Sequence, residues 1–344
     1  MARVADSSEA ELTGLAAAAV LAAVVAVTPF SAAVLHPVIA YPIAAVALAS
    51  LVYGRRVLLA VFACVAAGAM TLAVNQNWLY VIVSPLDGVP LTARAPIVFG
   101  ALTVGSLLLV GPITATLMRR RPALEMTAVV AIGLSVAQVV ALASLAQGAG
   151  MSLQAYMAQW AEGMFAPLAG LADAEETITE MSRTIAKAWP SLLVTLNGFT
   201  AVLTVAGVGF VAIRKRVAAF RFPVVASIDL NPLMVVPGIV GIGLLAAGRL
   251  EFGLAPVLDV IGTNLLMIVR WVFFLQGVAV FAALYERAKY GRLTRSLGYV
   301  LLGVTEVLVP LVSLTGLADI WLNIRRLPRE RQPVEVVEAP SDRD

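Results

Sequence analysis

The sequence predicts an all-α protein, a polytopic bundle of transmembrane helices with eight or nine membrane segments. Of its 344 residues, 60% are hydrophobic and only 13% are charged, and the mean hydropathy is +0.93. About a quarter of the residues in a typical soluble domain are charged. With so few charges the chain cannot cover a water-exposed surface, so lipid must solvate much of it. The apolar residues also occur in runs of about 20, the length that crosses a bilayer as a helix.

Nine apolar runs can be marked in chain order. They are Leu12–Val34, Pro37–Tyr53, Val57–Val74, Ala95–Met118, Ala123–Ala146, Pro190–Ile213, Pro232–Gly248, Pro256–Tyr285 and Leu297–Ile324. The first is too long for a signal peptide and has no basic residues directly before its core, so we expect it to be retained as a span. The third and seventh are short, and the eighth is long enough to tilt.

The basic residues predict the orientation, because they occupy alternate loops. These loops hold Arg55–Arg56, Arg119–Arg121, Arg214–Arg216 with Arg221, and Arg287 with Lys289, Arg292 and Arg295. The positive-inside rule places these loops and the N-terminus in the cytoplasm, and we expect a bacterial inner (plasma) membrane. A single crossing from Leu297 would export a tail that carries four arginines. Either the rule fails there, or Pro310 or the short seventh segment breaks a span, so eight and nine spans both stay open.

The predicted organisation has five parts. They are a polar cytoplasmic N-terminus at 1–11, N-terminal membrane helices at 12–146 (about five spans), an extracytoplasmic amphipathic segment at 147–189, C-terminal membrane helices at 190–326 and a disordered tail at 327–344. In the extracytoplasmic segment, Tyr156, Trp160, Met164 and Leu168 recur every four residues. This spacing predicts a helix over Ser152–Leu171 that lies on the membrane or caps the bundle.

Ionisable and amide side chains at membrane depth are the candidate functional residues, because each costs several kcal/mol to bury in lipid. The substrate-binding candidates are Asn264, Arg270, Gln276 and Asp259, all in the eighth segment. The candidates for structural ion pairs are Glu306, Asp319 and Arg325. Two roles stay open for Arg270. In the first it binds a substrate anion or controls access to the substrate, and in the second it only forms a structural ion pair with Glu306. Asp259 near a helix end is also compatible with simple hydration.

Several classes of function lack the residues that they need. The chain has no GxxxxGK[ST], HExxH, CxxC or GxSxG pattern, a single histidine (His36) and a single cysteine (Cys64). We therefore expect no catalytic residues, no metal site, no cofactor and no nucleic-acid binding. The expected partners are the lipid bilayer, other membrane subunits and a small-molecule substrate of unknown identity.

The C-terminal third carries a family resemblance. The stretches FFLQGVAVFAALYERAKYGR (273–292) and VTEVLVPLVSLTGLADIWLNIRR (304–326) resemble the closing pattern of YybS-like bacterial membrane proteins, a family of unknown function. Asn264 and the pair Gln276–Gly277 also stand where that pattern expects them. The family is distantly similar to the substrate-binding (S) components of energy-coupling-factor transporters, which lack an ATPase of their own. The resemblance therefore implies a transport component. A non-catalytic scaffold or assembly factor is the alternative, and an intramembrane lipid-processing enzyme has the least support.

Overall fold

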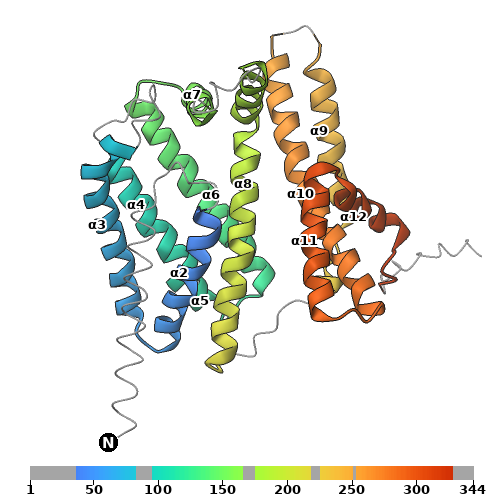
Figure 1. The fold of residues 1–344 in the computed structure, drawn as a ribbon, viewed down its shortest axis with the longest axis horizontal. Coiled ribbons are helices and arrows are strands. Elements are labelled where there is room, and N and C mark those ends of the chain that lie inside the picture. The colour runs from blue at the N-terminus through green and yellow to red at the C-terminus, as the bar shows by residue number, and fades with distance from the viewer. Residues whose placement is uncertain (1–35, 83–94, 166–174, 218–224, 251–252, 328–344) are drawn as a thin grey trace, which may run out of the picture. The chain divides into compact units, whose positions relative to one another are not determined.

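The computed structural model describes residues 36–82, 95–165, 175–217, 225–250 and 253–327. The fold is all-helical, with 86% helix and no strand within these ranges (Figure 1). The predicted N-terminal residues 1–11, the first predicted segment Leu12–Val34 and the tail from 328 onward lie outside the described residues. The all-α fold class is thus confirmed for a chain with several apolar helices.

The chain divides into two compact units. The first comprises Met1–Pro223 with Pro237–Ile268, and the second comprises Val224–Val236 with Val269–Asp344. The first unit contains α2 (His36–Tyr53), α3 (Val57–Ile82), α4 (Ala95–Leu108), η2 (Leu109–Ile113), α5 (Thr114–Leu117), α6 (Ala123–Gly148), α7 (Leu153–Phe165), α8 (Glu175–Arg214) and most of α9 (Val235–Ala247). The second contains η4 (Val225–Ser227), η5 (Pro232–Met234), α11 (Arg292–Leu308) and α12 (Leu311–Leu322). Helix α10 (Ala255–Arg287) contributes its first half to one unit and its second half to the other.

Small residues allow the helices of the first unit to pack closely. Ala45, Ala49 and Ala201 have no exposed surface in the core that α2 and α8 share with α3. Helices α3 and α4 approach at Gly68 and Gly100, where a Cβ on Gly68 would lie 2.9 Å from the Gly100 carbonyl oxygen. In lipid, where no hydrophobic force pulls apolar helices together, close backbone packing of this kind drives their association.

The fourth predicted segment is one continuous helical run with a wider turn inside it. Helix α4 passes through the π-helical turn η2 into α5, so that Ala95–Leu117 forms 23 residues of apolar helix. Pro112 lies in this turn and has no N–H to give to the helix. The Thr114 hydroxyl donates to the Leu109 carbonyl oxygen at 2.7 Å, which satisfies one acceptor that the wider turn exposes.

The amphipathic segment caps one end of the first unit. Tyr156 and Met157 of α7 are buried against Phe99 of α4 and Leu145 of α6. Helix α7 ends at Phe165, and the predicted continuation to Leu171 lies outside the described residues. The end of this segment, from Glu175, and the sixth predicted span form a single helix of 40 residues, α8, with Pro190 inside it.

The number of candidate spans is lower than the eight or nine that the sequence predicted. Within the described residues, four helices are long and apolar enough to cross a membrane: Ala95–Leu117, Ala123–Gly148, Glu176–Arg214 and Ala255–Arg287. A bent pair, Leu293–Glu306 with Leu311–Leu322, makes at most a fifth. The first predicted segment lies outside the described residues, and the apolar stretches counted within α2, α3 and η5–α9, at Ala40–Tyr53, Val57–Leu72 and Pro232–Ala247, have 10–17 residues each.

The last predicted segment does not form one straight helix. Its two halves, α11 and α12, meet at Val309–Pro310 with a bend of 100°. Val309 is extended there, with φ −143° and ψ 129°, because the residue before a proline disfavours the helical region. This is one of the two breaks that the charge distribution left open, and it brings Glu306 and Ser313 to the two sides of the bend.

Candidate functional site

Arg270 and Glu306 form an ion pair at the bend between α11 and α12. Arg270 is the sixteenth of the 33 residues of α10, and its Nε donates to Glu306 Oε1 at 2.8 Å while Nη2 donates to the Glu306 carbonyl oxygen. The Ser313 N–H, at the start of α12, donates to Glu306 Oε2 at 3.1 Å. The Ser313 hydroxyl lies 2.6 Å from Glu306 Oε1 and 3.0 Å from the Arg270 carbonyl oxygen, and its one proton serves one of them at a time.

The two partners of this pair differ in their exposure. The Glu306 side chain is 2% exposed and fully surrounded by donors, whereas the Arg270 side chain is 40% exposed. No described residue accepts a hydrogen bond from Arg270 Nη1. The pair therefore fixes one edge of the guanidinium group and leaves the other edge available to a planar anion.

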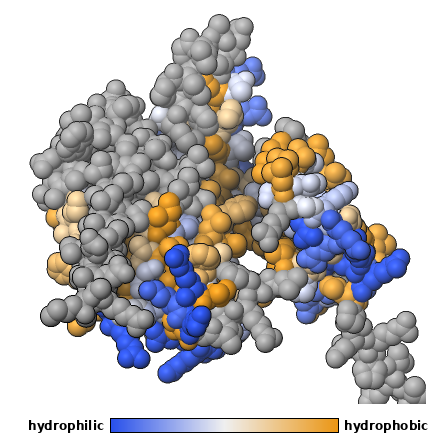
Figure 2. Space-filling model, turned by 60° about the horizontal axis from the view of Figure 1, so that its bottom comes forward, coloured by the Kyte–Doolittle hydropathy of each residue, from blue (hydrophilic) through white to orange (hydrophobic). Residues whose placement is uncertain are grey.

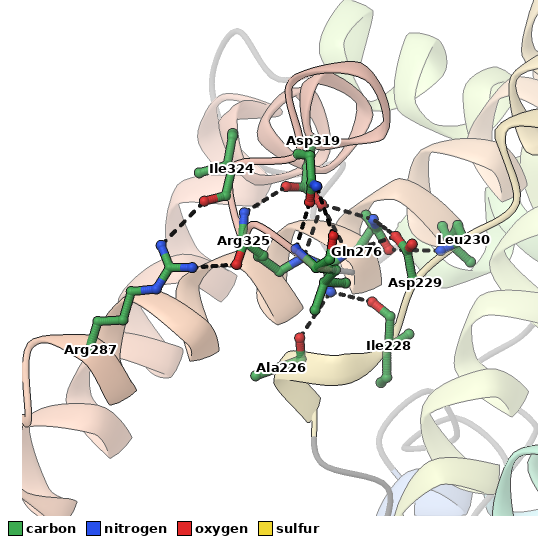
Figure 3. Close-up of polar contacts among 11 residues, drawn as sticks. Ala226, Ile228, Asp229, Leu230, Gln276, Arg287, Asp319, Ile324 and Arg325 are labelled. Carbon is green, nitrogen blue, oxygen red and sulfur yellow. Dashed lines mark hydrogen bonds and ion pairs between the residues drawn. The ribbon is translucent and has the colours of Figure 1, made fainter. Parts of the chain in front are cut away.

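A second cluster surrounds Arg325, just after α12, and we call Asp229, Gln276, Asp319 and Arg325 the arginine cluster (Figure 3). Arg325 Nε donates to Asp319 Oδ2 at 2.9 Å, and Nη2 forms an ion pair with the same oxygen at 2.8 Å and donates to Asp229 Oδ1 at 3.0 Å. Nη1 donates to the carbonyl oxygens of Ala226, at 3.0 Å, and Ile228. The side chains of Arg325 and Asp319 have no exposed surface.

Gln276 joins the arginine cluster from α10. Its Nε2 donates to Asp319 Oδ2 at 3.1 Å and to Asp229 Oδ1 at 3.2 Å, and its Oε1 accepts from the Leu230 N–H at 3.2 Å (Figure 3). Each of the three guanidinium nitrogens of Arg325 already contacts an acceptor within the second unit. The cluster therefore holds the 226–230 segment, α10 and the end of α12 together, and it encloses the Arg325 side chain, which has no exposed surface.

Two glycines bring α10 and α12 into direct backbone contact beside this cluster. A Cβ on Gly277 would overlap the Val312 carbonyl oxygen, and a Cβ on Gly316 would overlap the Phe273 carbonyl oxygen. Because both positions lack a side chain, the neighbouring Gln276 and Asp319 can reach each other. The Gln276–Gly277 pair and Gly316 thus serve one crossing of two helices.

Arg287, at the end of α10, contacts the chain where it leaves α12. Its Nη1 donates to the Ile324 carbonyl oxygen at 3.3 Å, and its Nη2 donates to the Arg325 carbonyl oxygen (Figure 3). Arg287 precedes α11 by five residues, so the chain enters and leaves the α11–α12 pair at neighbouring points.

Asn264 and Asp259 lie in the first unit and contact α8. Asn264 Oδ1 accepts from the Ser191 N–H, and Nδ2 donates to the Lys187 carbonyl oxygen, both at 2.9 Å. Asp259 pairs with the Lys187 ammonium group, with 2.5 Å between Oδ2 and Nζ, and both side chains are about one third exposed. These contacts connect two long helices and occupy both ends of the Asn264 amide.

The structure therefore places the four substrate-binding candidates in three groups. Asn264 and Asp259 contact α8, Arg270 contacts Glu306, and Gln276 belongs to the arginine cluster. Residues six apart on a helix point in directions about 120° apart, which separates Asn264, Arg270 and Gln276 around α10. Of the four, Arg270 alone combines a central position on the helix with a guanidinium nitrogen, Nη1, that donates to no described residue.

Three contacting residues were not singled out from the sequence. Asp229 lies in a loop, Ser313 in an apolar run, and Lys187 in the predicted extracytoplasmic segment at 147–189. Ser313 lies three residues after Pro310, and its place beside a predicted break is the local signal that could have pointed to it. Within the described residues, no group of three or more His, Cys, Asp and Glu side chains has the arrangement that holds a metal ion.

A protein-family model described as "Predicted membrane protein (DUF2232)" matches residues 88–320. The chain belongs to this family of predicted membrane proteins. The DUF2232 match covers about two thirds of the chain, from the residues before α4 to Ile320 in α12. It includes Arg270, Glu306, Gln276 and Asp319 and ends before Arg325. Neither the curated proteins nor the solved structures contain a significant match to the chain.

Proposed function

We propose that this DUF2232 protein is a substrate-binding component of a membrane transport system, and that Arg270 binds an anionic group of the substrate. The half-exposed Arg270 at the middle of α10 is the observation that carries the proposal. Placing an arginine at the centre of a span costs several kcal/mol. Such residues are therefore rare, and many of them belong to ion or substrate pathways. Glu306 orients this arginine and compensates its charge from one side only.

The bend between α11 and α12 supports the same site. Many transporters bind substrate near the middle of the bilayer, where broken helices offer uncompensated backbone groups to it. Here the bend lies opposite Arg270, and the first turn of α12 gives the Ser313 N–H to Glu306. An arriving carboxylate or phosphate would find the guanidinium edge already positioned, which lowers the entropic cost of binding.

The resemblance of residues 273–292 and 304–326 to YybS-like proteins adds support. That family is distantly similar to energy-coupling-factor S components, which depend on separate ATPases, and we extend this role to the chain as part of the proposal. A chain without a P-loop pattern fits this division of labour. We further propose a bacterial inner membrane with a cytoplasmic N-terminus, because the basic residues occupy alternate loops.

A non-catalytic scaffold is the second candidate, and the Arg270–Glu306 pair itself favours it. If the pair serves only to connect α10 with α11, the helix bundle needs no water-filled cavity and no ligand, and the loops would bind partner proteins. Ligand binding at Arg270 distinguishes the two candidate functions, because a scaffold would bind no small molecule at this residue.

The test uses the full chain purified in mild detergent. Small molecules released by denaturation are identified by mass spectrometry from the wild type, from Arg270→Leu and from Arg249→Leu. Arg249 is the matched control, an exposed arginine after α9. We expect an anionic molecule that is retained by the wild type and by Arg249→Leu and lost from Arg270→Leu.

Two results would overturn the transport proposal. One is an Arg270→Leu variant that unfolds at the wild-type temperature and keeps the molecule. The other is a wild-type protein that releases no anionic molecule and gains no thermal stability from a panel of carboxylates and phosphates; this result would favour the scaffold. If Arg270→Leu does not fold, Arg270→Lys replaces it, because lysine keeps the charge but not the planar fork.

A further inference from the structure

Three turns of the first unit carry a dense group of cations, which we call the basic end. It consists of Arg55, Arg56, Arg119, Arg120, Arg121, Arg214, Lys215 and Arg216. Within the described residues of these turns, Glu125 is the one carboxylate, and it lies 3.5 Å from Arg121. All of these cations except Arg56 are exposed.

The fold brings the three turns to the same end of the unit. Arg119 lies over the ring of Tyr53, with 5.4 Å between Cζ and the ring centroid, which joins the α5–α6 turn to the α2–α3 turn. Val211 and Ala212, in the last turn of α8, share a buried core with Tyr53 and Met118. Figure 1 shows the lower ends of α2, α5 and α8 together, and Figure 2 shows hydrophilic side chains gathered on the face that comes forward.

Exposed aliphatic side chains directly flank each basic turn. Leu58 follows Arg55–Arg56 and is 87% exposed, and Leu124 follows Arg121 and is 68% exposed. Ile213 precedes Arg214 and is 47% exposed, while Leu117 and Val57 are also among the exposed hydrophobic residues. A soluble surface rarely places large aliphatic residues so regularly beside cations.

We propose that the basic end binds the head groups of anionic phospholipids. The phosphates would contact the guanidinium groups, and the acyl chains would lie along Leu58, Leu124 and Ile213. Basic clusters beside membrane spans attract anionic lipid, and each cation near the surface contributes about fivefold to the affinity. The Tyr53 ring contacts Arg119 and so fixes the position of one guanidinium group of the basic end.

The aliphatic residues distinguish a lipid from other anionic partners. An acidic protein segment or a nucleic acid would use the cations, but it would leave the exposed leucines in contact with water. A phospholipid can contact the cations with its phosphate and the aliphatic side chains with its acyl chains. These two parts of the lipid are adjacent, as the cations and leucines are here.

The experiment measures lipid binding to the full chain by native mass spectrometry in detergent. The probes are phosphatidylglycerol, phosphatidylcholine with the same acyl chains, and glycerol phosphate. The test variant is Arg120→Gln with Lys215→Gln, and the control is Arg183→Gln with Arg249→Gln, which removes two exposed cations outside the basic end. We expect the wild type to prefer phosphatidylglycerol, the test variant to bind it about 25-fold more weakly, and the control to bind it as the wild type does.

A second variant examines the hydrocarbon contact. Leu58→Ser with Leu124→Ser changes two exposed positions, so it should fold, and we expect it to weaken phosphatidylglycerol binding several-fold. Equal binding of phosphatidylcholine, equal losses in the test and control variants, or competition by glycerol phosphate at the same concentration as the lipid would each overturn the proposal.

Discussion

Asn264 of α10 bridges the turn of α8 that contains Pro190. In a regular helix, the Ser191 N–H and the Lys187 carbonyl oxygen would bond to each other, but a proline at 190 distorts this turn. The Asn264 amide lies 2.9 Å from each of these two groups and satisfies both. The Ala186 carbonyl oxygen, which loses its partner because Pro190 has no N–H, accepts instead from Gln154 Nε2 of α7 at 2.8 Å.

This relationship predicts that Asn264→Leu destabilises the protein by about 1–3 kcal/mol, because two buried backbone groups lose their partners. The cost should shrink to less than half in a Pro190→Ala background, where residue 190 regains an N–H and the turn can close. Thermal unfolding of the four proteins in detergent measures this double-mutant cycle. Equal costs in both backgrounds would show that Asn264 does not support the proline turn.

The arginine cluster predicts a large cost when its buried charge loses compensation. Asp319→Asn leaves Arg325 with one carboxylate, Asp229, so we expect the free energy of unfolding to fall by about 3 kcal/mol. Glu286→Gln is the matched control, an exposed carboxylate near the end of α10, and it should change stability by less than about 0.5 kcal/mol. A loss of stability that is the same for both variants would contradict the compensating role of Asp319.

The α10–α12 crossing predicts opposite results for two glycine-to-alanine changes. Gly277→Ala places a methyl group against the Val312 carbonyl oxygen, so the helices must separate, at a cost of about 1–3 kcal/mol. A Cβ on Gly303 of α11 would meet nothing within 4 Å. Gly303→Ala should therefore be neutral or stabilise by up to about 1 kcal/mol. Unfolding temperatures decide this, and a stabilising Gly277→Ala would disprove the close approach.

The contact of Arg287 with Ile324 and Arg325 predicts that the α11–α12 pair re-enters the membrane rather than crossing it. The chain would then leave on the side where it entered, which also agrees with the arginines of the tail. In a Cys64→Ser background, we expect Tyr290→Cys and Ser341→Cys to react alike with a membrane-impermeant maleimide in sealed cells. Gln147→Cys should show the opposite accessibility. Labelling of Ser341→Cys together with Gln147→Cys would mean that the pair crosses.

Composition and periodicity predicted much of the fold. The positions of α6 and α10 agree with the predicted segments to within two residues, because a long apolar run bounded by charges has one stable form in lipid, a helix. A break at Pro310 was one of the two alternatives that the sequence left open. Its cause is also local, since a proline disfavours the helical region for the residue before it. The span count was less predictable, because an apolar run of 15 residues fits either a short buried helix or part of a span.

The partners of the polar residues depended on the tertiary structure. The sequence pointed to Arg270 and Asp319 as charges at membrane depth, because such residues are rare and costly there. It contained no signal that Asp229 contacts an arginine 96 residues later, or that Asn264 contacts Ser191 across 73 residues.

The sequence by itself thus determined that this protein is a helical membrane protein and which side chains are too polar for lipid to solvate. Only the tertiary structure decided that Gln276 and Arg325 lie within a closed cluster, whereas Arg270 keeps an open edge. The physical reason is that backbone pairing in a helix is local, so hydropathy alone can predict it. The pairing of side chains depends on where helices cross, and those crossings are made at glycines such as Gly277 and Gly316, far apart in the chain.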